Sequence, residues 1–551
     1  MARKHRDTAG PSLARTAGKP SARSRRKASP AAVPAAAVVR DEAVDRFARR
    51  IFWAAGIAAL LLLGFLCFFP VQSDDVFMYL AIGRRVMREK AFPTIDPFLF
   101  SIPNYHWHIL HEWATHLIVY GLFCLGGWTL LIVAKTLMLL AAAGMALVAA
   151  WRLGVRSAVV PLLLILAAVA GYHRFIERSS LTSDFLTAAV LAIVALDRAK
   201  PGRLRYLLPF IFLAWVNLHP GFYVGLVICG LAVLWDIRRI RQRPVQIFAG
   251  CVLASALLCL VNPQGVAGIT YPLQPIFDRR WDICRVYNYE WMPTLNPRYL
   301  HSIHVPAFLG LIGLCILLAL TALRRRPWFE ISVLALLVWL GLSAARFLTT
   351  ASFALCVLAV VLVSKSWFHE AAAGPWRLPR LNIATSSAVI AVAVVCCFKI
   401  AFWGYDSLAG PRHLGGGLDA VRHPTGAADF IDRIGLETNL FNEHGFGTYL
   451  AWRWDGQRKL YFHGFVDDMD FYAHNYIGVT ESREQFNRIV NEFQIGAFLL
   501  NRPDPDGLPL VYRVLLNSPE WRLVFRDDRS MLFLRTIPQN EAAFARGLSA
   551  Q

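Results

Sequence analysis

The chain has 551 residues, of which 56% are hydrophobic and 17% charged, and its formal net charge is +20. Soluble domains typically carry about 25% charged residues, so this composition excludes a soluble globular protein and indicates a polytopic membrane protein. Nucleic-acid binding is not indicated, because much of the positive charge lies in the first 50 residues and in short loops between apolar runs.

Residues 1–50, rich in Ala, Pro, Ser, Arg and Lys, are predicted to form a disordered basic tail in the cytoplasm. The tail is too long and too charged for a signal peptide, so we expect the apolar run after it to be retained as the first membrane helix. A transmembrane domain is predicted over residues 51–404. Its eleven expected spans are 51–71, 128–150, 157–172, 184–197, 206–217, 222–236, 245–261, 305–323, 329–345, 348–364 and 383–404.

Charge fixes the expected orientation of these spans. With the tail inside, every predicted inner loop carries arginine or lysine, as the positive-inside rule requires. The loops 72–127 and 262–304 and the C-terminal residues 405–551 then share the opposite face. In a bacterial inner membrane that face is periplasmic.

The first external loop, 72–127, opens with two adjacent acidic residues, Asp74 and Asp75. Charge beside a bilayer is costly and often functional. A helix is predicted from about Val76, with apolar residues on one side and a run of arginines on much of the rest, which is typical of an interfacial helix with its apolar side in lipid. A second amphipathic stretch begins near His111.

Three arginines, Arg174, Arg178 and Arg346, lie at predicted outer ends of spans, where the positive-inside rule does not explain them. Arginine suits phosphate recognition, and snorkelling to the interface is an equally good interpretation. Asn217 and His219 occupy a short outer turn. They could contact a substrate, although satisfying helix-end carbonyls is the favoured interpretation.

Several acidic and histidine residues of the outer loops are further candidates. His111 and Glu112, with His108, could supply a second carboxylate or ligands for Mg²⁺ or Mn²⁺, but the pattern is weak for a metal site. Glu290, beside Trp291 in the second long outer loop, could close over the site.

Residues 405–551 are no longer membrane-like and predict a compact extracytoplasmic α/β domain. The expected helices are 425–434 and 482–493. The expected strands are 460–465, 495–500, 521–525 and 531–534, of which the last two form a hairpin. The chain has no Walker loop, GxGxxG, GxSxG or HExxH motif.

In its order of parts the chain resembles the GT-C class of membrane glycosyltransferases, and particularly bacterial proteins of that type. The likeness rests on motifs spread over about residues 50–535: Asp74-Asp-Val-Phe-Met-Tyr-Leu-Ala-Ile-Gly83, Phe92-Pro-Thr-Ile-Asp-Pro-Phe98, His111-Glu-Trp113, Trp215-Val-Asn-Leu-His-Pro-Gly-Phe222, Asn262-Pro-Gln-Gly265, Glu290-Trp-Met-Pro293, Phe441-Asn-Glu-His-Gly-Phe-Gly-Thr-Tyr-Leu450 and Gly464-Phe-Val-Asp-Asp468. It lacks the WWDYG string of oligosaccharyltransferase catalytic subunits.

The resemblance implies a donor sugar carried on a polyprenyl phosphate and an acceptor hydroxyl on a glycan, lipid or protein. An aspartate of the first loop would be the general base, with Asp74 preferred over Asp75. Arg174, Arg178 and Arg346 would bind the donor phosphate. His111, Glu112, Asn217, His219 and Glu290 would contact substrate.

Two other functions remain open. The first is a non-catalytic scaffold for assembly of cell-envelope glycans, with the C-terminal region as a docking module. The second is a transporter, which the sequence disfavours because the spans are nearly free of charge apart from Lys135 and no internal repeat is visible.

Overall fold

The computed structural model describes residues 42–107, 109–366, 379–407, 410–503 and 508–548. Residues 1–41 of the expected tail and His108 lie outside these ranges. Residues 42–50, which the sequence interpretation assigned to the tail, are helical. They form the first turns of α1 (Glu42–Cys67), which continues without a break into the apolar run.

Long apolar helices account for most of residues 42–404, and the protein is a polytopic helical membrane protein. In the described ranges, six helices are long and apolar enough to cross a membrane. A helix occurs at each of the eleven expected ranges, but five of them are shorter, so the number that cross stays a prediction. The eleven are α1, α3 (Trp113–Leu153), α4 (Val159–Gly171), α5 (Ser180–Ala199), α6 (Leu208–Leu218), α7 (Phe222–Trp235), α8 (Arg243–Leu258), α13 (His304–Ala322), α14 (Trp328–Ser343), α15 (Leu348–Lys365) and α17 (Pro379–Trp403).

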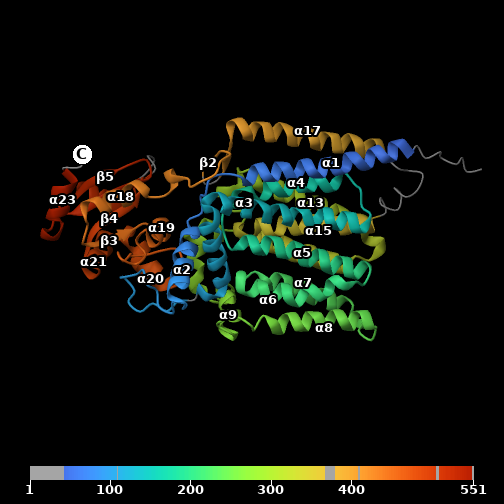
Figure 1. Ribbon diagram of the computed structural model, residues 1–551, viewed down its shortest axis with the longest axis horizontal. Helices are drawn as coiled ribbons and strands as arrows, with labels where there is room; N and C mark the ends of the chain where they lie inside the picture. Colours follow the sequence, from blue (N-terminus) through green and yellow to red (C-terminus); the bar gives the residue numbers. More distant parts are fainter. Residues whose placement is uncertain (1–41, 108, 367–378, 408–409, 504–507, 549–551) are drawn as a thin grey trace, which may run out of the picture. The chain divides into compact units, whose positions relative to one another are not determined.

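These helices run side by side in Figure 1, with α17 along α1 and α8 next to α6. The centre of the bundle is α15, which packs against α3, α4, α5, α13 and α14. Every residue of α15 from Leu348 to Val363 is buried, which explains why its sequence is apolar all round rather than on one face.

Helix α2 (Asp75–Glu89) follows the first membrane helix and packs between α3 and α19 (His444–Trp454). Val76, Tyr79, Leu80 and Gly83 are buried within the protein, whereas Met87 is exposed. The expectation that the apolar side of this helix lies in lipid is therefore wrong. The sequence pattern was right about an amphipathic helix, but protein rather than lipid covers it.

The amphipathic stretch after His111 and the following span form one helical element, α3, with a kink. Gly126 and Gly127 have non-helical backbone angles, and Gly127 has a φ of 60°, which glycine adopts without steric cost. The part before the kink packs on α2, and the part after it enters the bundle.

The second long outer loop is built from short turns. They are α9 (Val266–Thr270), α10 (Gln274–Phe277), α11 (Asp282–Tyr287) and α12 (Pro297–Leu300), joined by the 3₁₀ turns Tyr271–Leu273, Arg279–Trp281 and Tyr289–Trp291. Glu290 lies in the last of these turns, and the Asn288 side chain caps that turn by accepting from the Glu290 N–H at 3.0 Å.

Residues 405–548 contain a hairpin and a four-stranded mixed sheet. The hairpin pairs β1 (Tyr405–Ser407) with β2 (Gly410–Arg412). The sheet has the order β3-β4-β6-β5, with β3 parallel to β4 and the other pairs antiparallel. Its strands are β3 (Asn439–Asn442), β4 (Ile495–Asn501), β5 (Trp521–Arg526) and β6 (Ser530–Arg535), and its longer helices are α18 (Thr425–Ile434), α19, α21 (Arg483–Glu492), α22 (Leu510–Asn517) and α23 (Glu541–Leu548).

Most of the secondary structure expected in this region is confirmed, including both helices and the β5–β6 hairpin. The strand expected at 460–465 is wrong. Only Leu460 pairs there, in an isolated bridge with Leu99. The Asn442 carboxamide accepts the N–H of Tyr461 at 3.0 Å, so a side chain takes the place of a ladder partner.

Candidate functional site

The two adjacent aspartates at the start of α2 take part in different contacts. Asp75 Oδ2 accepts the Nε–H of Arg178 at 2.6 Å. Asp74 Oδ1 lies 3.4 Å from Nδ1 of His423, and its backbone carbonyl accepts from the Thr448 hydroxyl at 2.7 Å. Successive helical residues point about 100° apart, so Asp75 faces the segment before α5 and Asp74 faces the C-terminal region.

The three arginines singled out in the sequence come together around Glu290. Arg174 Nη1 lies 2.6 Å from Glu290 Oε1, and Arg178 Nη1 contacts the same oxygen. The Arg346 guanidinium stacks on the neighbouring Trp291 ring at 4.3 Å. Burial alone would raise the pKa of the Glu290 carboxyl, but the charges of these three arginines outweigh it and lower that pKa.

Arg178 therefore joins Asp75 to Glu290, and a second layer of polar groups lies next to it. The Tyr79 hydroxyl donates to Ser179 Oγ at 3.2 Å, and the Ser179 N–H donates to the Tyr79 oxygen at 3.3 Å. Glu112 is buried near Ser179 and Asp75, and burial raises the pKa of its carboxyl. His111 lies further out, with its ring centroid 4.9 Å from that of Tyr271.

The residues of the short turn after α6 separate into two roles. Asn217 accepts from Trp113 Nε1 at 2.7 Å and donates to the carbonyls of Leu213 and Val261, both at 2.9 Å. Its polar atoms are thus engaged with the helix end. His219 Nδ1 lies 2.6 Å from the Ser183 hydroxyl. Desolvation lowers the pKa of His219, and the nearby charges of Arg346, His111, Arg178 and Arg174 lower it further.

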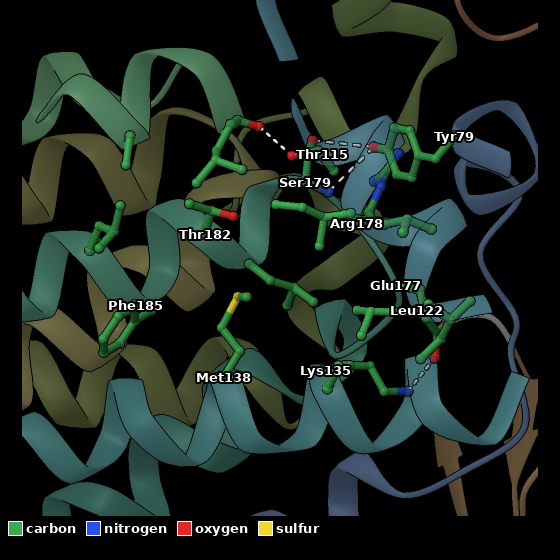
Figure 2. A pocket seen from close by; sticks show the side chains of 18 of the residues that line it. Tyr79, Thr115, Leu122, Lys135, Met138, Glu177, Arg178, Ser179, Thr182 and Phe185 are labelled. Carbon is green, nitrogen blue, oxygen red and sulfur yellow. Dashed lines mark hydrogen bonds and ion pairs between the residues drawn. The ribbon is translucent and has the colours of Figure 1, made fainter. Parts of the chain in front are cut away.

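An apolar cavity of about 520 Å³ opens beside this cluster. Side chains of α2, α3, α5 and α6 line it, and Figure 2 shows Tyr79, Arg178 and Ser179 together on one side. Met138 and Phe185 lie away from them. Ile118, Leu207 and Phe210 of its wall are exposed apolar side chains, which is typical of a cavity that reaches the lipid-facing surface.

A buried ion pair on the cavity wall was not expected from the sequence. Lys135 Nζ lies 2.7 Å from Glu177 Oε1 and 3.7 Å from the centroid of the Phe69 ring. Lys135 stood out only as a rare charge within a span, and a buried cation of this kind requires a partner. Its partner, Glu177, directly follows residues 172–176 in the chain. The position of Glu177 next to the arginines of that segment was the one signal in the sequence that could have pointed to it.

The C-terminal region also contributes to the surroundings of the aspartates. Gly445, in the first turn of α19, lies close enough that an added Cβ would be 3.3 Å from Asp74 Oδ2. Burial lowers the pKa of the neighbouring His444, while the charges of Asp74 and Asp75 oppose that shift. The motif Phe441–Leu450 holds both residues, but nothing in the sequence alone indicated that it meets Asp74.

Two carboxylates of this site, Asp75 and Glu290, already have arginine partners. Within the described ranges, no three His, Cys, Asp or Glu residues are grouped so that they could hold one. Asp75 and Glu290 are each bound by arginine, and a cation between them would face three guanidiniums. His108, which belonged to the proposed metal pattern, lies outside the described residues.

Comparison with known proteins found similarity among solved structures only. No family model matches the chain, and no curated protein matches it. ArnT from Cupriavidus metallidurans in the apo state matches with a TM-score of 0.50 and 18% identity, over 87% of this chain and 96% of that one. ArnT bound to undecaprenyl phosphate matches with a TM-score of 0.48 and 14% identity, over 88% and 98%.

An oligosaccharyltransferase from Archaeoglobus fulgidus, in complex with Zn and sulfate, matches with a TM-score of 0.48 and 10% identity. The match covers 81% of this chain and 68% of that one. At these identities, the likeness to apo ArnT concerns the fold alone. The protein therefore has a membrane fold similar to that of apo ArnT.

Proposed function

We propose that this GT-C-like protein is a membrane glycosyltransferase that moves a sugar from a polyprenyl phosphate to an acceptor hydroxyl. One observation carries the proposal: the apolar cavity is lined by Arg178, whose guanidinium also binds Asp75. A polyprenyl chain needs an apolar cavity that reaches the bilayer, and its phosphate needs a cation at the end of that cavity. Here the apolar cavity and the cation lie together, because Arg178 is itself part of the cavity wall.

Cavity size and charge agree with this assignment. A volume of about 520 Å³ lies within the usual range for ligand sites, roughly 300–1,000 Å³, so it suits the first part of the lipid chain. Arg178, which lines the cavity, would bind the phosphate together with Arg174 and Arg346 beside it. The likeness of the fold to that of apo ArnT supports the same class.

Asp75 is the general base in this proposal. The anomeric carbon is attached to the phosphate, so the base must lie near the phosphate ligands, and Asp75 shares Arg178 with them. Its carboxylate takes the proton of the acceptor hydroxyl as that oxygen bonds to the anomeric carbon. The bond between this carbon and the phosphate oxygen breaks, and polyprenyl phosphate leaves with the electron pair, stabilised by the arginines.

The remaining assignments follow from the same arrangement. Glu112 and His219 would contact the sugar or acceptor, because both lie near the arginine cluster. Asn217 and His111 would shape the surroundings rather than react. The site would face the periplasm of a bacterial inner membrane, with the N-terminus in the cytoplasm and residues 405–551 as an extracytoplasmic domain.

The sugar and acceptor can be sought in a deletion strain. We expect loss of one modified glycan, lipid or glycoprotein, restored by the wild-type chain and not by Arg178→Gln expressed at the same level in the membrane. Restoration by the variant would contradict catalysis at this site and favour a scaffold. An unchanged glycan and lipid profile in the deletion strain would contradict the transferase itself.

A further inference from the structure

Two arginines, Arg174 and Arg178, share one acidic partner, Glu290, and a third, Arg346, lies beside it. Arg174 ends a 3₁₀ turn (Tyr172–Arg174), Arg178 follows in the segment before α5, and Arg346 lies in the turn Ala345–Phe347. Arg174 and Arg178 contact the same oxygen of Glu290, and Arg346 stacks on the residue next to it. The Glu290 carboxylate thus lies between the arginine side chains.

The buried arginines of this cluster are offset by acidic side chains, of which Glu290 makes the most direct contacts. Arg174 and Arg178 contact the carboxylates of Glu290 and Asp75, and the buried carboxylates of Glu112 and Asp184 act on Arg178 and Arg174 from nearby. Arg174 is only 7% exposed, and buried like charges are costly unless an anion offsets them. A protein that binds a phosphate here must therefore satisfy these arginines with something else when the phosphate is absent.

Glu290 comes from a loop of short turns and not from one of the long helices of the bundle. The outer loop between α8 and α13 consists of short turns, and its longest helix, α11, has six residues. The turn that carries Glu290 is held by the cap from Asn288 and by a hydrogen bond from the Tyr299 hydroxyl to the Tyr289 carbonyl. The arginines, in contrast, lie at the ends of the helices in the bundle.

We propose that Glu290 is a built-in competitor of the donor phosphate, which holds the arginine cluster in the empty site and is displaced when the lipid phosphate binds. This inference rests on the proposed function. A carboxylate and a phosphate oxygen make the same charge-assisted contacts with arginine, so one can replace the other at Arg174 and Arg178.

Displacement has a consequence at both ends of the reaction. Donor binding must compete with Glu290. The apparent affinity for the donor is therefore the intrinsic affinity multiplied by the fraction of sites that the carboxylate has left. After transfer, the return of Glu290 to the arginines favours release of the polyprenyl phosphate product. The loop that carries Glu290 thus changes the affinity for the lipid phosphate and does not change the binding of the apolar chain.

Glu290→Gln tests the inference, because it removes the charge and keeps the shape. Binding of undecaprenyl phosphate and of undecaprenol to the purified full chain is compared with Asp282→Asn, an exposed residue of the same loop that pairs with Arg285. We expect Glu290→Gln to bind the phosphate about tenfold more tightly than wild type. Binding of undecaprenol should not change, and Asp282→Asn should match wild type.

The outcomes separate the two proposals. Equal or weaker phosphate binding by Glu290→Gln, while wild type binds, would overturn the competitor role and leave the transferase standing. Absence of phosphate-dependent binding in wild type would overturn both.

A second measurement needs no variant. Hydrogen exchange of residues 286–293 in wild type should rise when undecaprenyl phosphate is added, because Glu290 leaves the arginines. Slower exchange there would mean that the loop closes on the lipid and would contradict displacement.

Discussion

The Nε of Arg178 lies 2.6 Å from Oδ2 of Asp75, which places the start of α2 against the segment before α5 at a single ion pair. Asp74, one residue earlier, contacts His423 instead, at 3.4 Å. Two neighbouring residues of the same type therefore lie in two environments. This difference makes them a natural pair of matched variants.

Asp75→Asn should lower the rate of sugar transfer about a hundredfold or more, because an amide cannot accept the acceptor's proton. Asp74→Asn should retain most of the activity. The rate is measured with the product identified from the deletion strain, at equal amounts of protein in the membrane. The reverse order of effects would place the base at Asp74, as the sequence analysis preferred.

Arg178→Gln should abolish measurable binding of undecaprenyl phosphate, since it removes the guanidinium that lines the cavity. Arg178→Lys keeps the charge but not the contacts to two carboxylates, so intermediate binding is expected. Arg285→Gln, an exposed arginine of the outer loop, is the control. Full binding by Arg178→Gln would show that the phosphate lies elsewhere.

Ala214→Trp should raise the KM for the lipid donor severalfold and leave kcat unchanged, because the larger side chain fills part of the cavity without touching the reacting groups. Ala391→Trp, at an exposed position of α17 away from the cavity, is the matched control. Equal KM values in both variants would indicate that the lipid chain does not use this cavity.

Arg412→Gln should destabilise the protein by about 3 kcal/mol, since charged hydrogen bonds are worth about 1.5–3 kcal/mol each. The buried guanidinium donates to Gln72 Oε1 at 3.0 Å and to the carbonyls of Tyr172 and His173 at 2.6 and 3.1 Å. Thermal unfolding in detergent measures the loss, with the exposed Arg433→Gln as control. Equal melting temperatures would contradict an anchoring role.

The stabilising contacts of Glu290 should depend on pH in one direction. Its pKa in the folded protein is lowered below the ordinary value of 4.5, so the folded state binds fewer protons at this group than the unfolded state near that pH. The stability that the ionised carboxylate contributes is therefore present above pH 4.5 and is lost as the pH falls below it.

The difference in melting temperature between wild type and Glu290→Gln measures this contribution. We expect it to stay constant from pH 8 to 5.5 and to shrink at lower pH. A difference that already changes between pH 8 and 6 would mean that another group controls it.

The regular elements could be predicted from the sequence because their signals are local. The apolar run expected at 348–364 is α15, and the helix expected at 425–434 is α18. The surroundings of α2 could not be predicted. Arg84 and Arg88 indicated a solvent-facing or interfacial side, yet Arg84 stacks on Trp452 at 4.0 Å and Arg88 pairs with Asp455. These partners lie more than 360 residues away in the chain.

In the candidate site too, single residues could be predicted from local signals, whereas their contacts could not. The positive-inside rule does not explain arginines at predicted outer helix ends, and this local signal was enough to single out Arg174, Arg178 and Arg346. Their convergence on Glu290 depends on how the bundle packs, and no periodicity carries that information. Lys135 and Glu177 were visible as charges, but only the packing of α3 against α5 makes them partners.

The contacts of Arg412 have a practical consequence for exchanging parts between related proteins. Together with the bridge between Val71 and Leu418, they fasten the segment after α17 to the base of the aspartate loop. A chimera joined directly after Trp403 would replace Arg412 and Leu418 by residues of the other protein. The contacts between the C-terminal region and the membrane helices would then be lost. A junction placed after residue 419 would keep these contacts native, and the disturbance would then fall on the contacts that His423 and α19 make with Asp74 and α2.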